Sequence, residues 1–190
     1  MGDIRPAHCY RWDSPTFTRV SRTPSNSYIT GIPGNKILHF TYGKPELYEK
    51  EISVIYKDRM MVRHNALESA RIVAQKFLLK NIKENFSLLI RPYPHHVMRE
   101  NAQASGAGAD RVQQGMRQSF GKAVGRAAKV YKGQKLASIF VHPENLEVAK
   151  QAAERMLAKL PGEKIIVIED TKKAKETKIS DAGAAVETNK

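Results

Sequence analysis

The sequence has few of the features that mark secreted, membrane-spanning or lipid-anchored proteins. It contains one cysteine, Cys9, in 190 residues, which excludes an internal disulfide and fits a reducing compartment such as the cytosol. No run of about 18 apolar residues is present and the N-terminal stretch lacks an apolar core, so neither a spanning helix nor a secretion signal is predicted. Pro6 stands where an N-myristoylation signal requires Ser or Thr.

Sequence motifs for metal, nucleotide or catalytic chemistry are also missing. Five residues separate Gly115 from the Gly-Lys pair that ends at Lys122, and Ala follows, so the P-loop pattern is not met. The Gly-Ala-Gly stretch at Gly106 lacks the third glycine of a dinucleotide fingerprint. Six histidines and one cysteine form no set with zinc-ligand spacing. Neither Ser105 nor Cys9 is accompanied in the sequence by a recognisable general base and a residue to orient that base, so neither is predicted to be a catalytic nucleophile. The sequence predicts no cofactor, no metal and no catalytic residue.

Positive charge is abundant and unevenly distributed. The chain carries 32 Lys and Arg against 19 Asp and Glu, a net charge of +13 and a pI near 9.9. Such an excess indicates a polyanionic partner, either nucleic acid or anionic lipid. Residues 80–135 hold eleven basic residues and three acidic ones, whereas residues 136–170 hold four and six. This concentration predicts a nucleic-acid-binding surface in the central stretch, although charge alone does not distinguish RNA from DNA.

Hydrophobic periodicity predicts an α+β fold. Strands are expected at 36–42, 51–56, 86–90, 124–130, 136–141 and 164–168. A helix is expected over 65–83, opened by Asn65 as the N-cap with Glu68 three residues later. A second helix is expected behind Pro143, with an apolar stripe that runs to Leu160. Two strand–helix–strand units predict a mixed sheet with both helices packed on one face.

Three regions are expected along the chain. Residues 1–35 form an arm, since prolines recur every nine residues and basic and aromatic residues alternate. We expect this arm to gain order against RNA, and the alternative is a strand-rich subdomain with a few packed aromatics. Residues 36–170 form a single RNA-binding domain with a flexible, glycine-containing loop at 101–115. Residues 171–190 form a disordered tail.

Several short motifs resemble one ribosomal protein family. They are Arg5-Pro-Ala-His-Cys-Tyr-Arg11, Arg91-Pro-Tyr-Pro-His-His96, Ala107-Gly-Ala-Asp-Arg-Val-Gln-Gln-Gly-Met-Arg117 and Phe120-Gly-Lys122. The family is the archaeal and eukaryotic L-ten-e (QM) protein, equivalent to the universal L-sixteen protein of bacteria. The resemblance runs from about residue 4 to residue 169. Residues 101–105 read Asn-Ala-Gln-Ala-Ser where eukaryotic members tend to have a Cys, which favours an archaeal-type chain.

The resemblance implies a structural constituent of the large ribosomal subunit, located in the cytoplasm. Family members lie near the base of the central protuberance, against large-subunit ribosomal RNA and beside the tRNA sites. Loop 101–115 would point towards the tRNA acceptor arm and the peptidyl transferase centre. Neighbouring ribosomal proteins and assembly factors are further implied partners, in translation and late subunit assembly, and no catalytic side chain is implied.

The expected RNA contacts are cationic, aromatic or imidazole side chains: Arg5, Arg11, Trp12, Arg19, Arg22, Arg91, His95, His96, Arg99, Arg117, Lys122, Arg126, Lys129 and Lys132. The loop residues expected near tRNA are Gly106, Gly108, Asp110, Arg111 and Gln114. The second helix lies in the acidic segment, so we expect Glu147, Glu154 and Lys159 to make no RNA contact. An RNA-modifying enzyme and an architectural DNA-binding protein are the alternative functions.

Overall fold

The computed structural model describes residues 12, 14–18, 23–44, 46–101, 115–117 and 119–171. The strands are β1 (Thr41–Gly43), β2 (Lys50–Tyr56), β3 (Met60–Arg63), β4 (Ser87–Ile90), β5 (His96–Glu100), β6 (Lys122–Val130), β7 (Lys135–Val141) and β8 (Lys164–Asp170). The α-helices are α1 (His64–Ile82) and α3 (Leu146–Leu157), and short 3-10 helices lie at Pro24–Asn26 (η2) and Pro143–Asn145 (η3).

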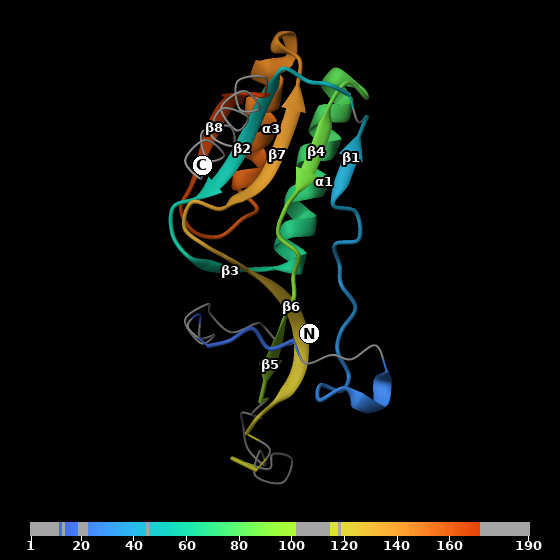
Figure 1. Cartoon of the computed structure of the whole chain (residues 1–190), viewed down its shortest axis with the longest axis vertical. Coiled ribbons are helices and arrows are strands. Elements are labelled where there is room, and N and C mark those ends of the chain that lie inside the picture. Colours follow the sequence, from blue (N-terminus) through green and yellow to red (C-terminus); the bar gives the residue numbers. More distant parts are fainter. Residues whose placement is uncertain are drawn as a thin grey trace, which may run out of the picture.

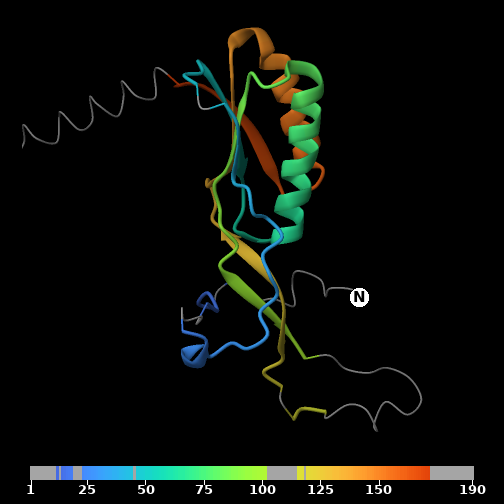
Figure 2. The same ribbon diagram turned by 90° about the vertical axis from the view of Figure 1, so that its right-hand side faces the viewer.

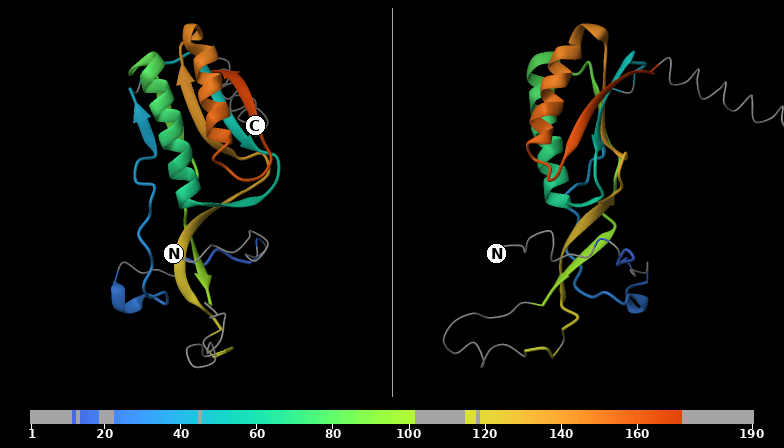
Figure 3. Two further views of the ribbon diagram at one scale, coloured as in Figure 1. Left: turned by 180° about the vertical axis from the view of Figure 1, so that it is seen from behind. Right: turned by 90° about the vertical axis from the view of Figure 1, so that its left-hand side faces the viewer.

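The larger sheet has five strands in the order β1-β4-β7-β2-β8 (Figure 1). At its centre, Ile52 of β2 lies opposite Ile139 of β7 and Ile168 of β8. Both α-helices cover the same face of this sheet, as the views from behind and from the side show (Figure 3). The α+β class and the packing of two helices on one face are therefore confirmed.

The sheet is antiparallel throughout, so the prediction of a mixed sheet is wrong. Every adjacent pair in it runs antiparallel. The helical connection from β7 through α3 does make β8 parallel to β7, but β2 lies between these two strands. In the same way β4 is parallel to β2, and β7 separates them. Two interleaved split β-α-β units thus have no parallel neighbours.

The core lies between this sheet and the two helices. α1 buries an apolar stripe at spacings of three and four residues: Leu67, Ala70, Ala74, Leu78 and Ile82. α3 buries three alanines and one methionine: Ala149, Ala152, Ala153 and Met156. The three alanines are small, so the two helices can approach closely. On the outside of the pair, the guanidinium of Arg155 lies 4.0 Å from the ring centroid of Phe77.

The termini of both helices differ in detail from the prediction. α1 begins at His64 with Arg63 as its N-cap, and no side chain caps it, so Asn65 does not serve as the N-cap. Glu68 instead forms an ion pair with Arg71, one turn further along, at 2.6 Å. α3 ends at Leu157, three residues before the predicted end of its apolar stripe.

A second sheet of three strands, in the order β3-β6-β5, extends from the first (Figures 1 and 2). β6 pairs antiparallel with both neighbours. The sequence pattern did not predict β3 or β5. Of the strand expected at 36–42, the structure has only Thr41–Gly43, and Gly43 requires glycine because a Cβ there would lie 2.0 Å from the carbonyl oxygen of Phe86.

Residues 14–18 and 23–35 lie beside the second sheet (Figure 2). Residues 1–11 of the expected arm and residues 172–190 of the expected tail fall outside the described residues. The division into an arm, a domain at 36–170 and a tail stays a prediction.

Candidate nucleic-acid interface

The N-terminal segment is hydrogen-bonded to the rest of the chain at separate points. The backbone N–H of Phe17 donates to Nδ1 of His96 at 2.9 Å, and its carbonyl oxygen accepts from the N–H of Val97 at 3.0 Å. Further along, the N–H of Lys36 donates to Nδ1 of His64 at 3.2 Å. Two imidazoles therefore hold this segment as hydrogen-bond acceptors, one on β5 and one at the start of α1.

Both imidazoles are neutral at physiological pH. Burial, together with the charges of Lys129 and Arg99, lowers the pKa of His96 to about 4. Burial and then three neighbouring cations lower the pKa of His64 below its ordinary value. A neutral ring can accept a hydrogen bond at Nδ1, whereas a protonated ring cannot. The predicted role of His96 in RNA binding is therefore not that of a cation near neutral pH.

Arg99 of β5 lies against two aromatic rings that also contact each other. Its guanidinium carbon is 4.5 Å from the ring centroid of Phe17 and 4.0 Å from that of Phe120. The two ring centroids are 5.4 Å apart and the ring planes meet at 70°. Gly121 lets the chain place Phe120 here, because its φ is +80° and a Cβ would lie 2.7 Å from the carbonyl carbon of Glu100. The cluster joins the N-terminal segment, β5 and the turn before β6.

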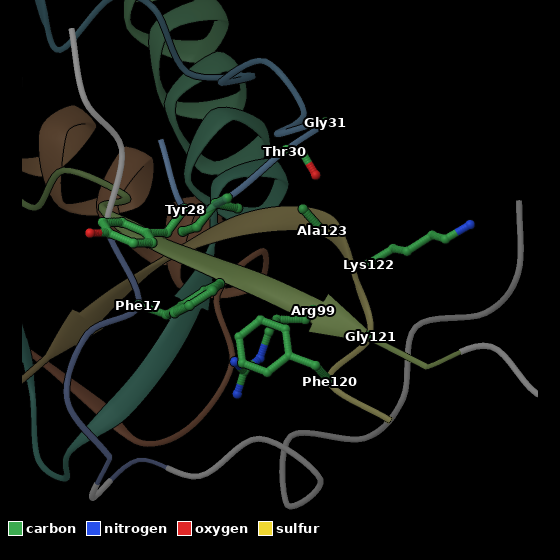
Figure 4. Close-up of a pocket in the computed structure, with 10 residues that line it drawn as sticks. Phe17, Tyr28, Thr30, Gly31, Arg99, Phe120, Gly121, Lys122 and Ala123 are labelled. Carbon is green, nitrogen blue, oxygen red and sulfur yellow. The ribbon is translucent and has the colours of Figure 1, made fainter. Parts of the chain in front are cut away.

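With Tyr28, these three side chains form what we call the aromatic pocket: Phe17, Tyr28, Arg99 and Phe120 (Figure 4). The four residues line two adjoining cavities of about 370 and 480 Å³. Tyr28 remains 78% exposed and Phe120 63% exposed. Lys122 lines the smaller cavity, and its ammonium has no hydrogen-bond or ion-pair partner among the residues that the structure describes.

A second aromatic and cationic cluster lies at the other end of β6. The rings of Trp12 and Tyr131 meet edge to face, with centroids 5.5 Å apart. The ammonium of Lys129 lies 5.6 Å from the Trp12 ring centroid and donates to the Trp12 carbonyl oxygen at 2.9 Å and to that of Ser14. Lys129 thus fastens the chain near Trp12 to the second sheet.

Two of the predicted RNA-binding arginines make contacts within the protein. Nε of Arg126 donates to the carbonyl oxygen of Pro33 at 3.1 Å. Arg91 donates from Nε to Oγ of Ser138 at 3.0 Å and forms an ion pair with Glu51 at 3.0 Å. Arg91 lies on the face of the larger sheet opposite the helices, and its side chain is 38% exposed.

Glu51 is the centre of this polar network. Its carboxylate is nearly buried and also accepts from Ser53 at 2.8 Å, from Ser138 at 2.7 Å and from Lys135 at 3.2 Å. Burial alone would raise the pKa of Glu51, but the hydrogen bonds from Ser138, Ser53 and Lys135, with the Lys135 charge, lower it below its ordinary value. The carboxylate is therefore ionised at neutral pH and orders the cations around it.

The structure brings six of the predicted RNA-binding residues together on or against the second sheet: Trp12, His96, Arg99, Lys122, Arg126 and Lys129. Arg91 lies on the larger sheet, and three others are exposed in turns or connections: His95, Arg117 and Lys132. The remaining predicted site residues lie outside the described part of the chain: Arg5, Arg11, Arg19, Arg22, Gly106, Gly108, Asp110, Arg111 and Gln114. Their RNA and tRNA contacts stay predictions.

Sequence reasoning did not select three aromatic residues of the aromatic pocket: Phe17, Tyr28 and Phe120. Phe17 and Tyr28 belong to the alternating basic and aromatic pattern of the arm, which was the available signal. Phe120 lies outside this alternating pattern, and its place in the pocket depends on the turn at Gly121.

Within the described ranges, no group of three or more His, Cys, Asp or Glu side chains is placed to hold a metal ion. Neither α1 nor α3, nor any other described helix, combines the length and apolar character needed to span a bilayer.

The fold and this surface define a small α+β protein whose basic and aromatic side chains gather on a separate second sheet. Residues 14–167 match a family model described as "Ribosomal protein L16p/L10e". A large ribosomal subunit protein uL16 from Natronomonas pharaonis is 44% identical over 163 residues, which cover 82% of this chain and 89% of the relative. The proteins of the same name from Methanococcus aeolicus and Methanoculleus marisnigri are each 46% identical, over 87% and 83% of this chain and 94% and 91% of theirs.

This chain therefore belongs to the ribosomal protein L16p/L10e family. The resemblance seen in the sequence motifs is confirmed, and the similar relatives named above are archaeal.

Proposed function

We propose that this chain is a structural constituent of the large ribosomal subunit that binds large-subunit ribosomal RNA through its second sheet and the segment packed on it. The family supports the ribosomal role. The observation that carries the RNA-binding surface is the gathering of cations and aromatic rings on and against β5 and β6 (Figure 1).

Phosphate neutralisation is the main physical basis of this proposal. Three exposed cations around the second sheet have no hydrogen-bond or ion-pair partner among the described residues: Arg117, Lys122 and Lys132. Such cations release counterions from RNA when they meet phosphates, which favours binding strongly at low salt. The aromatic rings nearby supply surfaces on which bases stack.

The side of the molecule that α3 forms has a different charge character from the second sheet. α3 lies in the segment 136–170, where acidic residues outnumber basic ones. Its exposed positions include Glu147 and Glu154, which would repel phosphate. We infer that this side faces neighbouring ribosomal proteins, assembly factors or solvent and not the RNA.

The loop expected to approach tRNA departs from the far end of the second sheet. Asn101 follows the last residue of β5, and residues 115–117 precede β6. We infer that RNA binding by the second sheet positions loop 101–115, which then reaches towards the tRNA acceptor arm and the peptidyl transferase centre. The role of the chain in this proposal is positional and non-catalytic, in the cytoplasmic ribosome.

Salt-dependent binding to a transcript of large-subunit ribosomal RNA tests the RNA-binding surface. We expect log Kd to rise linearly with log salt concentration, and Lys122→Gln or Lys132→Gln to reduce the slope by about 0.7–0.9 each. Lys159→Gln is the matched control, because it removes an exposed lysine just after α3, and we expect the wild-type slope. A slope independent of salt, or an equal effect of all three variants, would contradict the proposal.

A further inference from the structure

We propose that the aromatic pocket takes an unpaired RNA base, which stacks on Phe120 or Tyr28 while Lys122 binds the adjoining phosphate. This inference rests on the proposed RNA-binding function and names the part of the RNA that the pocket recognises: a nucleotide outside a duplex.

Two rings of the aromatic pocket are open to solvent. Tyr28 and Phe120 are 78% and 63% exposed although both line the same two cavities. A single exposed aromatic residue is ordinary on a protein surface. Two of them facing common cavities, beside cations, form a surface that suits a planar, apolar group with a negative charge attached to it. A nucleotide has this combination, because every base has a π-face and carries a phosphate.

Contacts within the protein hold the rings of the pocket in place. Arg99 lies 4.0 Å from the centroid of Phe120 and 4.5 Å from that of Phe17, so its guanidinium fixes both rings. Phe17 is in turn held by the hydrogen bond to His96. Figure 4 shows Arg99 beside Phe120, with Tyr28 on the far side of Phe17. A preformed stacking surface binds a base at lower entropic cost than a mobile side chain does.

The size and charge of the pocket also suit a nucleotide. A cavity of about 370 Å³ lies within the range of about 300–1,000 Å³ seen for small-molecule pockets. Figure 4 shows the Lys122 side chain extending away from the rings. In this proposal its ammonium meets the phosphate of the stacked nucleotide outside the pocket. A base inside an RNA duplex already stacks on its neighbours, so the pocket favours single-stranded or bulged RNA.

The test compares two strands that differ only in their bases. One is a fluorescently labelled single-stranded RNA of mixed sequence, about twelve nucleotides long, and the other is an abasic chain of equal length and charge. Stacking contributes about 1–3 kcal/mol per base, so the full-length protein should bind the base-bearing strand about 5- to 150-fold more tightly. Tyr28→Ala and Phe120→Ala should each remove much of this preference and leave binding of the abasic chain within about twofold of wild type.

Two further variants separate the roles of the residues. Lys122→Gln should weaken binding of both strands equally, because it acts on the phosphate. Arg99→Lys keeps the charge but not the planar group, so it should reduce the base preference by mispositioning Phe120. Tyr93→Ala removes another exposed aromatic ring, which stacks on Phe40 at 5.3 Å, and should leave both affinities unchanged. Thermal melting of each variant shows whether the fold is retained.

The outcomes distinguish this inference from the proposed function. Equal affinity of wild-type protein for both strands, with a normal salt slope, would refute the pocket and leave the RNA-binding surface intact. The same holds if Tyr28→Ala and Phe120→Ala, both folded, weaken the two strands equally. If neither strand binds the protein in a salt-dependent way, the RNA-binding surface itself is refuted. Photochemical cross-links from the base-bearing strand to the peptides carrying Tyr28 or Phe120 would support the pocket independently.

Discussion

Nδ1 of His96 accepts the backbone N–H of Phe17 at 2.9 Å, across 79 positions of the sequence. The pKa of His96 is lowered from 6.5 to about 4, because burial and the charges of Lys129 and Arg99 disfavour its protonated form. The folded protein therefore binds fewer protons at this site than the unfolded chain between these two pH values. The stability that neutral His96 contributes to the fold is complete above about pH 6.5 and is lost as the pH falls towards 4.

We therefore expect the unfolding free energy to decrease less steeply in His96→Gln than in wild type as the pH is lowered through this range. Glutamine offers an amide oxygen that accepts the Phe17 N–H and does not titrate. Urea denaturation at several pH values between about 4 and 7.5 measures the difference. His39→Gln changes an exposed histidine and should keep the wild-type dependence. Identical curves for His96→Gln and wild type would show that this hydrogen bond does not link the fold to pH.

The carboxylate of Glu51 should be a major contributor to stability. Glu51→Gln leaves Arg91 and Lys135 without their shared anion on the nearly buried face of the sheet. We expect the free energy of unfolding to fall by about 2–4 kcal/mol. This is somewhat less than the cost of breaking a fully buried ion pair, because the Arg91 side chain is partly exposed. Urea denaturation at neutral pH measures it.

The control for this variant is Glu163→Gln. Glu163 forms an exposed ion pair with Lys57 at 3.5 Å, and its loss should cost no more than about 1 kcal/mol. Similar losses for the two variants would mean that the network around Glu51 adds nothing beyond an ordinary surface ion pair.

The sequence pattern predicted those elements that carry an apolar stripe at helical spacing or a strand-length segment rich in apolar residues. The apolar stripe of α1 and the strands β2, β4, β6, β7 and β8 fall into this class. β5 was missed because its only apolar residues are Val97 and Met98, and His96 and Arg99 flank this pair. Its burial comes from pairing with β6 and from the N-terminal segment, which no local pattern reveals.

The same distinction applies to the candidate site. Counting charges located the basic stretch, because that signal is additive along the chain. It could not show that Arg126 donates to Pro33, 93 positions away, or that Arg91 pairs with Glu51, 40 positions away. The aromatic pocket depends on contacts of this long-range kind, between residues 17, 28, 99 and 120.

Gly121 should be more sensitive to substitution than another glycine with a similar backbone. Gly121→Ala brings a Cβ to 2.7 Å from the carbonyl carbon of Glu100 at a φ of +80°. At Gly133 the φ is +76°, and nothing lies within 4 Å of an added Cβ. We expect Gly133→Ala to cost about 1 kcal/mol from the backbone alone and Gly121→Ala about 1–3 kcal/mol more. Equal losses in urea denaturation would show that the approach of the chain to Glu100 is relaxed at no cost.

The loop between the second-sheet strands should matter for translation and not for the stability of the fold. Residues 102–114 are mostly small or polar, so they can bury little apolar area, and their glycines raise the entropic cost of ordering. Replacing them with a short Gly-Ser linker should leave the unfolding free energy within about 0.5 kcal/mol of wild type.

Arg111 is the sharpest test of the loop, since it is the one cation in the sequence from 102 to 114. It is therefore the charge that the loop can offer to tRNA or to the RNA of the catalytic centre. Arg111→Ala should give a folded protein that enters the subunit but slows translation or subunit activation. Gln113→Ala, which removes no charge, is the control. A wild-type rate in both assays for Arg111→Ala, or its failure to fold, would make the loop a structural insertion without the proposed role at the tRNA site.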